Sequence, residues 1–96
     1  MADRKYITPD IIETKILKNY CVYIKFENNE EKIYNMKNLI ETNKFYSNLK
    51  DKEYFKKLKI RGDTLEWANG EDIAPENLYY DSVPIKEFKG EIKEWE

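Results

Sequence analysis

Apolar and polar residues alternate in two segments of the first third of the chain, the pattern of half-buried β-strands. The alternating positions are Ile12, Thr14 and Ile16 in the first segment and Val22, Ile24 and Phe26 in the second. A turn at Asn19-Tyr20 separates the two segments. Residues 27–30 form a hairpin turn, because Asn tolerates the positive φ that tight hairpins require, and residues 31–34 return as a third strand. The pattern predicts an antiparallel meander.

Short helical turns are predicted in the middle of the chain. Residues 36–40 form one turn, and Phe45 and Leu49 are spaced four apart, which places both side chains on one helical face. Asp51 caps a further short helix. The residues of this helix expected to face the core are Tyr54, Phe55 and Leu58. A fourth strand follows, in which Leu58 and Ile60 alternate with basic residues.

The segment 64–79 carries the clearest fold signature. Trp67 shares a strand face with Leu65 and is expected in the core, and Asn69-Gly70 is a strong hairpin signal. Pro75 suits the first position of a helical turn, which Asp72 is expected to orient by accepting backbone N–H bonds. The signature residues are Trp67, Asn69, Gly70, Asp72 and Pro75.

These elements predict an α+β fold. Its sheet is small and antiparallel, a meander plus a hairpin, with short helices packed on one face. We assign residues 1–81 to this single domain and residues 82–96 to an acidic tail. A chain of 96 residues is long enough for one domain and too short for two. An aromatic content of 15% argues against disorder.

Composition narrows the candidate chemistry. The chain has no His, and its single Cys21 excludes an intramolecular disulfide. The first residues lack the apolar region of a signal peptide, and no apolar run is long enough to span a bilayer, so a cytoplasmic location and no membrane association are expected. Neither an enzymatic activity nor a cofactor is expected.

The carboxylates beside the Asn-Gly turn are the remaining chemical candidates. Glu66, Glu71 and Asp72 would form a divalent-metal cluster or an acid–base pair in a functional interpretation. Their spacing matches no calcium loop, and carboxylates at a hairpin tip are ordinarily solvated. We therefore favour a structural or surface role and predict no metal site.

Charge is distributed unevenly along the chain, although the net charge is −2. Residues 44–61 include seven basic and two acidic residues, and residues 71–96 include eight acidic residues and three Lys. The two regions attract each other in one interpretation, and in another they steer a charged partner. The residues that would contact an anion or a nucleic acid are Lys52, Lys56, Lys57, Lys59 and Arg61. Nucleic-acid contact is the disfavoured alternative.

The acidic tail has the spacing of an amphipathic helix. Its apolar residues, spaced three, four and three apart, are Ile85, Phe88, Ile92 and Trp95. Gly90 costs this helix about 1 kcal/mol, so it is marginal alone. Two interpretations stay open: the tail folds back on its own domain, over the basic segment, or it docks in the groove of a partner protein.

From about residue 18 to residue 80 the chain resembles the domain of unknown function 2442 family of small bacterial proteins. The resemblance rests on three blocks: Tyr23 to Glu31 with Tyr34; Leu49-Lys-Asp51 with Tyr54-Phe55 and Leu58-Lys-Ile60; and Thr64 to Ile73 with Pro75-Glu76 and Leu78-Tyr79. It implies a compact α+β domain without an established activity. It also suggests toxin–antitoxin pairing with a small neighbouring protein.

We therefore expect a non-enzymatic protein-binding module, of antitoxin-like type, whose partner contacts the apolar residues of the tail. One alternative is an inhibitor of a nuclease, carried by a phage or mobile element and acting by charge mimicry as anti-CRISPR proteins do. Another is a weak nucleic-acid binder that uses the basic segment 52–61. A homodimer is compatible with all three, because sheet edges and the tail offer pairing surfaces.

Overall fold

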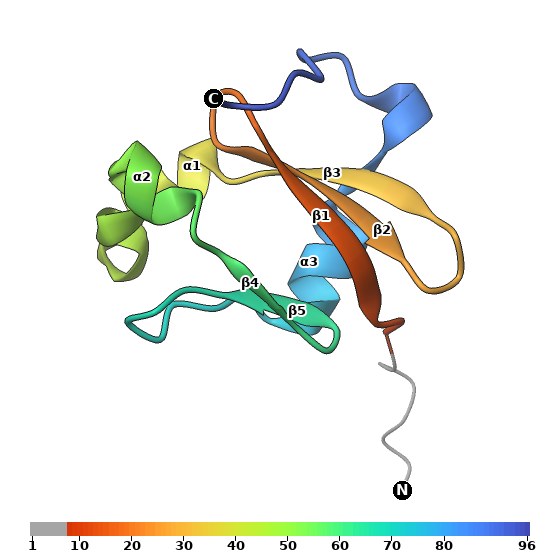
Figure 1. Cartoon of the computed structure of the whole chain (residues 1–96), viewed down its shortest axis with the longest axis horizontal. Helices are drawn as coiled ribbons and strands as arrows, with labels where there is room; N and C mark the ends of the chain where they lie inside the picture. The colour runs from red at the N-terminus through yellow and green to blue at the C-terminus, as the bar shows by residue number, and fades with distance from the viewer. Residues whose placement is uncertain (1–7) are drawn as a thin grey trace, which may run out of the picture.

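A four-stranded antiparallel sheet and a separate two-stranded hairpin make up the β part of the structure (Figure 1). The computed structural model describes residues 8–96. The prediction that the chain lacks a signal peptide concerns its first residues, which lie outside this part. The elements in chain order are β1 (Ile11–Leu17), β2 (Cys21–Phe26), β3 (Glu31–Asn35), α1 (Lys37–Thr42), η2 (Lys44–Lys50), α2 (Lys52–Phe55), β4 (Lys59–Arg61), β5 (Thr64–Glu66), α3 (Pro75–Asp81), β6 (Val83–Pro84) and η3 (Ile85–Glu87). The sheet has the order β1-β2-β3-β6, and β4 pairs with β5. The predicted α+β fold is confirmed.

The turns of the meander use left-handed backbone where the sequence supplies Asn. Asn19 and Asn29 have φ values of 63° and 72°, and Asn adopts this region more readily than most residues. Tyr20 also has a positive φ, of 61°, which is uncommon for a bulky residue. Its hydroxyl donates to the main-chain oxygen of Lys50 at 2.5 Å, so the turn is tied to η2.

One face of β1 differs from the prediction. Ile12 was expected to face the core with Thr14 and Ile16, but it is 55% exposed, and Ile11 is buried instead. The register of β1 against β2 shifts between Ile11 and Glu13. Such a bulge inserts one residue into the strand, which reverses the side-chain alternation beyond it. A periodicity of two cannot reveal where a bulge lies.

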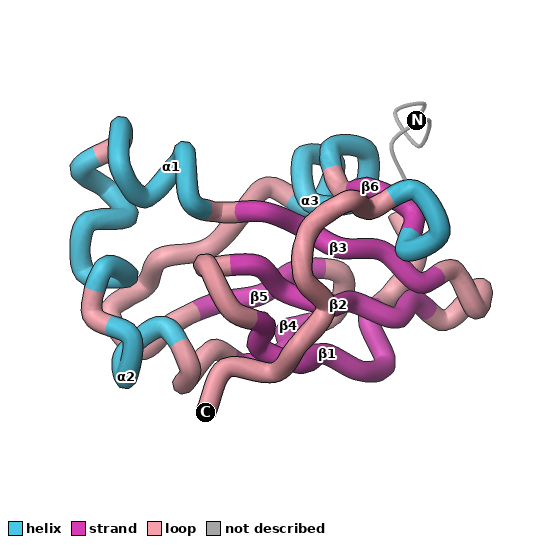
Figure 2. Tube along the Cα trace, turned by 90° about the horizontal axis from the view of Figure 1, so that it is seen from above, coloured by secondary structure: helices cyan, strands magenta, loops and turns pink. Residues whose placement is uncertain are grey.

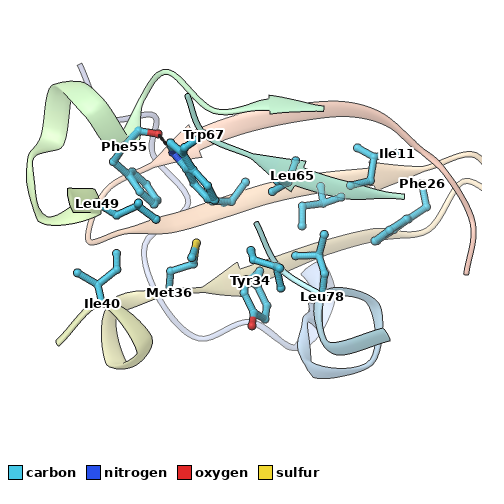
Figure 3. Packing of buried hydrophobic residues seen from close by; sticks show 13 residues of the cluster. Ile11, Phe26, Tyr34, Met36, Ile40, Leu49, Phe55, Leu65, Trp67 and Leu78 are labelled. Atoms are coloured by element: carbon cyan, nitrogen blue, oxygen red, sulfur yellow. Dashed lines mark hydrogen bonds between the residues drawn. The ribbon is translucent and has the colours of Figure 1, made fainter. Parts of the chain in front are cut away.

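The core lies between the inner face of the larger sheet, the β4–β5 hairpin and the helices (Figure 3). Val22, Ile24 and Phe26 are fully buried, as predicted. Trp67 is also buried as predicted; its indole N–H donates to the main-chain oxygen of Phe55 at 2.9 Å. The polar atom of this large side chain is therefore satisfied inside the core.

The segment after α1 is a 3₁₀-helix, η2, and this changes which residues share a face. Leu49 is fully buried, whereas Phe45 is 54% exposed, so the predicted pairing of these two residues is wrong. Side chains align at a spacing of three in a 3₁₀-helix and not at four. Tyr46, three before Leu49, packs against the core instead. The predicted cap of the next helix is confirmed, because the Asp51 side chain accepts from the Glu53 N–H.

The signature segment forms the expected turns, with one correction. Gly62 and Gly70 have φ values of +62° and +97°, which favour glycine at both turns. Pro75 begins α3 as predicted, but Asp72 does not cap it: the N-cap is Ala74 and makes no side-chain bond. The missing N–H of Pro75 leaves fewer free donors for a cap to satisfy. Ile60 in β4, predicted to face inward, is 40% exposed.

The tail is not an amphipathic helix. Val83–Pro84 pairs with β3 as the fourth strand of the sheet, η3 is a single 3₁₀ turn, and the chain after it is extended. An extended chain advances about 3.3 Å per residue against 1.5 Å in a helix. In this extended form the tail runs from η3 across the sheet to β1, where it is held. Among residues 8–96 no helix is both long and apolar enough to cross a membrane.

Candidate functional site

Residues 89–96, which we call the strap, cross the outer face of the larger sheet from η3 to β1 (Figure 2). The strap ends as a short antiparallel addition to the free edge of β1, with Glu94 opposite Leu17. Two backbone hydrogen bonds of 2.9 Å hold it there, from the Lys18 N–H to the Lys93 oxygen and from the Trp95 N–H to the Ile16 oxygen. Of the two interpretations left open for the tail, the structure shows the folded-back one.

The strap begins at an apolar cluster on the outer face of the sheet. The buried members of this cluster are Leu17, Cys21, Tyr23 and Ile33, and Ile85 and Phe88 pack against them. Gly90 lies against the ring of Phe88, since a Cβ on Gly90 would be 2.6 Å from Cζ of that ring. Gly90 therefore packs closely on this ring, and a larger residue here would require the Phe88 ring to move.

Trp95 anchors the other end of the strap. Its ring makes an edge-to-face contact with Tyr20, with 4.8 Å between centroids, and a second with Phe55 at 6.2 Å. Lys52 Nζ lies 5.2 Å from the centroid of the Trp95 ring and also donates to the main-chain oxygen of Glu96. A cation over an indole face adds electrostatic attraction to the packing. No local pattern could have identified Tyr20 as this platform, because it lies far from Trp95 in the sequence.

The second half of the strap, residues 92–96, does not fill the space beside the sheet. A cavity of about 720 Å³ lies between the strap and the sheet, lined by Leu17, Tyr23, Lys52, Ile92 and neighbouring residues. Ile92 does not reach the sheet and is 47% exposed. The four apolar tail residues predicted to contact a partner are therefore split: Ile85, Phe88 and Trp95 pack on their own domain, and Ile92 faces solvent.

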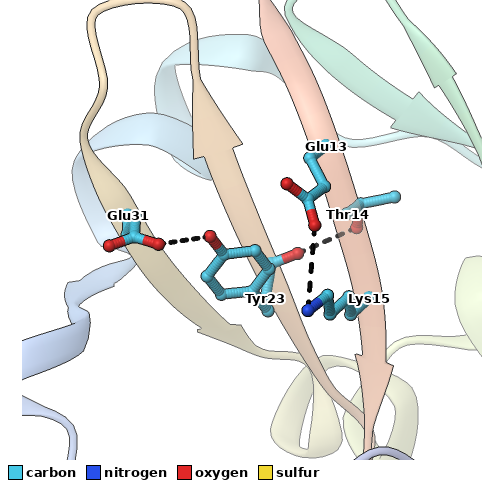
Figure 4. Close-up of polar contacts among 5 residues, drawn as sticks. All are labelled: Glu13, Thr14, Lys15, Tyr23 and Glu31. Carbon is cyan, nitrogen blue, oxygen red and sulfur yellow. Dashed lines mark hydrogen bonds and ion pairs between the residues drawn. The ribbon is translucent and has the colours of Figure 1, made fainter.

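Hydrogen bonds connect Tyr23 of β2, near the strap, to the neighbouring strands β3 and β1 (Figure 4). The Tyr23 hydroxyl donates to the Glu31 carboxylate at 2.5 Å, and Thr14 Oγ1 donates to the Tyr23 main-chain oxygen at 2.9 Å. Burial, the Glu31 hydrogen bond and the nearby charges of Glu31 and Glu13 raise the pKa of Tyr23 to about 12. The hydroxyl thus stays protonated and holds β2 to β3. Burial likewise raises the pKa of the Cys21 thiol, which makes it a poor nucleophile.

The five basic residues predicted to contact an anion do not act as one group. Lys52 is engaged by the end of the strap, and Arg61 forms a 2.7 Å ion pair with Glu66. Lys59 lies opposite the same Glu66 in the β4–β5 hairpin. Lys56 and Lys57 follow the end of α2, the first half-buried and the second exposed. Two of the five charges thus have partners within the domain.

The three carboxylates beside the Asn-Gly turn do not form one cluster, because Glu66 and Asp72 lie opposite each other in a β-bridge whereas Glu71 is buried. Glu66 pairs with Arg61, Asp72 is exposed, and Glu71 is buried at 3% exposure. Glu71 accepts hydrogen bonds from the Tyr54 hydroxyl at 2.6 Å and from Asn48 at 3.1 Å. Burial alone would raise the pKa of Glu71, but these hydrogen bonds, with backbone N–H groups, lower it below its ordinary value. Within residues 8–96 no group of three or more metal-ligating side chains converges.

Most of the chain matches a known protein family. A family model described as protein of unknown function (DUF2442) matches residues 11–84, from the start of β1 to the end of β6. The match is wider than the resemblance noted from the sequence at residues 18–80, and the strap lies outside it. No curated protein and no solved structure gave a significant match to the chain.

Proposed function

Because the chain belongs to the DUF2442 family, which carries no assigned activity, we propose that it is a non-enzymatic protein-binding module whose strap docks on a partner protein. The observation that carries the proposal is the way in which the strap is held. It is held by the packing of Trp95 on Tyr20 and Phe55 and by two main-chain hydrogen bonds, and a cavity lies beside its residues 92–96. A segment attached in this way leaves its own domain and binds in a partner's groove at a modest cost in free energy.

The chemistry of the strap indicates the kind of groove that it fits. Ile92 and Trp95 are its apolar residues, and its three Glu against two Lys, Lys89 and Lys93, give it a net charge of −1. An extended segment of this composition suits a groove with apolar pockets and a basic rim, in which main-chain hydrogen bonds give affinity and alternate side chains give specificity. An antitoxin-like role, with a small toxin as the partner, is the specific form of this proposal.

The experiment is an affinity capture from the native host with three forms of the protein. The first is the full chain and the second ends at Phe88, which keeps β6, η3 and the apolar cluster in place. The third carries Leu17→Cys and Glu94→Cys in a Cys21→Ala background. These positions are directly opposite in an antiparallel pair, the geometry that a disulfide can bridge. Oxidation locks the strap to β1, and reduction of the same sample is its own control.

We expect one stoichiometric protein to bind the full chain and the reduced double-cysteine form. The same protein should be lost from the form that ends at Phe88 and from the oxidised form. Equal capture by all forms would contradict the proposal, because the strap would then be dispensable. Nucleic acid in the eluate, bound independently of the strap, would favour the basic-segment alternative.

A further inference from the structure

The free edge of β1 is a binding surface that the strap of the same chain occupies, beside β1 in Figure 2. Its main-chain groups bind the strap through the Lys18 N–H and the Ile16 oxygen. Next to them, Tyr20 and Phe55 contact the Trp95 ring. We call this surface, with Lys52 beside it, the strap site. When the strap leaves, an unpaired strand edge and an aromatic surface are exposed together, and both are surfaces on which other chains bind.

The strap site is held in shape by contacts that do not involve the strap. The Tyr20 ring makes an edge-to-face contact with Phe55, with 5.2 Å between centroids, and its hydroxyl donates to the Lys50 main-chain oxygen. Phe55 is fully buried and stacks on Trp67. Tyr20 has a φ of 61°, a strained conformation for a bulky residue that persists only where its surroundings impose it. The site is therefore formed before a strap binds, which lowers the free-energy cost of binding.

The strap is attached only near its far end. All of its residues are exposed except Trp95, which is half-buried. Within residues 8–96, no backbone hydrogen bond joins residues 89–92 to another segment. The chain bends at Gly90, two residues after Phe88, which packs on the outer apolar cluster. Residues 89–92 are therefore a hinge, because a change in their backbone angles carries Trp95 away from its own domain while Phe88 stays in place.

The strap and its site are also complementary in charge. In the cavity between them, Lys18 and Lys52 lie on the side of the domain, and Glu94 and Glu96 lie on the side of the strap. Every copy of the chain carries this strap and the site that fits it. A second copy is thus the partner whose fit to the site is already visible within one chain.

We propose that two copies of the chain exchange straps, so that each strap pairs with β1 of the other copy. The exchange is reciprocal and gives a closed two-fold dimer in which both sites are filled. The contacts at each site are the same as within one chain, so the dimer is opposed only by the lost freedom of two molecules. It competes with the closed monomer as the protein concentration approaches that of a short flexible linker, on the order of 1 mM.

The exchange rests on the opening of the strap, which the proposed function also requires, but it needs no other protein. The two proposals fail separately. Exchange between copies without a strap-dependent partner in the affinity capture supports the exchange alone. A strap-dependent partner without exchange between copies supports the proposed function and overturns the exchange.

The test is a disulfide trap between two differently substituted full chains, both in a Cys21→Ala background. One carries Leu17→Cys and the other Glu94→Cys, the positions that lie opposite each other in the strap pairing. Neither chain forms this disulfide alone, so a mixed disulfide dimer requires the strap of one copy to lie on β1 of another. We expect the mixed dimer, identified by its mass. It should be lost when Trp95→Ala is added to the Glu94→Cys chain.

Ile12→Cys, in place of Leu17→Cys, is the matched control. Ile12 also lies on β1 and is 55% exposed, but it is not opposite the strap. Accidental collisions therefore oxidise Ile12→Cys at least as readily as the buried Leu17→Cys. A mixed dimer as abundant with Ile12→Cys as with Leu17→Cys would overturn the proposal. So would a mixed dimer that persists with Trp95→Ala, or none with Leu17→Cys.

If Leu17→Cys does not fold, sedimentation equilibrium of the unsubstituted chain decides the question. We expect a dimer whose fraction rises with protein concentration up to about 1 mM. Trp95→Ala should remove this dimer, because the site then has no ring to hold. Ile92→Ala, at an exposed position of the strap, should leave it unchanged. The absence of a dimer, or an equal dimer in Trp95→Ala, would overturn the proposal.

Discussion

At the scale of single residues, the buried carboxylate of Glu71 shows how a candidate for chemistry becomes part of the fold. It lies in the Asn-Gly signature, and its partners Tyr54 and Asn48 come from α2 and η2. The Tyr54 hydroxyl also accepts from the Asn69 N–H at 2.8 Å, so one phenol joins the turn to its carboxylate. The sequence predicts the turn but not this cluster, because three separate segments form it.

Replacing Glu71 with Gln should destabilise the domain by about 2 kcal/mol, since the buried partners lose a charged acceptor. The pKa of Glu71 is lowered on folding, so the carboxylate stabilises the domain fully above its ordinary value of 4.5. That contribution is lost as the pH falls through the lower folded-state value. Urea unfolding of both proteins at several pH values should therefore show a difference that shrinks in acid.

Glu66→Gln is the control for this experiment. It removes a partly exposed ion pair with Arg61, which is worth about 0–1 kcal/mol at most. If Glu71→Gln loses no more unfolding free energy than Glu66→Gln, or if its loss does not change with pH, the buried hydrogen bonds of Glu71 contribute little to stability.

At the scale of elements, the strap and η2 show why periodicity alone was insufficient. Phe45 and Leu49 have helical spacing, yet η2 is a 3₁₀-helix with a different repeat. Phe88 and Trp95 also have helical spacing, yet Phe88 packs just before the extended strap and Trp95 near its far end. In both cases the tertiary contact decides the conformation. The β-strands and hairpin turns were predictable because their signals, alternation and turn residues, are local.

Trp95→Ala should release the strap without unfolding the sheet. The variant loses two edge-to-face aromatic contacts, each worth about 0.5–1.5 kcal/mol, and the contact with Lys52. The Lys18 amide, which donates to Lys93, should exchange faster with solvent, while amides of the buried β2 strand keep their protection. Ile92→Ala, at an exposed position of the same strap, should leave the exchange rates of the Lys18 amide and of the β2 amides unchanged. If the Lys18 amide exchanges at the same rate in Trp95→Ala as in the unsubstituted protein, the Trp95 ring is not an anchor.

At the scale of the whole molecule, the sequence accounts for the α+β class, most strands, the core Trp67 and the family. It could not place the strap, because the tail's contacts with β1 and Tyr20 join the two ends of the domain. Nor could it find the strap site, whose residues come from β1, the turn after it and α2. The local signals lie within one element, whereas this site is assembled from distant ones.

If the strap is the docking segment, it must open independently of the domain that it covers. The most direct measurement is native-state hydrogen exchange of the full chain at increasing denaturant concentration. We predict that the Lys18 and Trp95 amides exchange through a small local opening that depends little on denaturant, because releasing a short terminal segment exposes far less surface than global unfolding does. Amides of β2 should exchange only through global unfolding. If the Lys18 and Trp95 amides instead exchange with the free energy and denaturant dependence of β2, the strap is an integral part of the fold and does not open by itself to bind a partner.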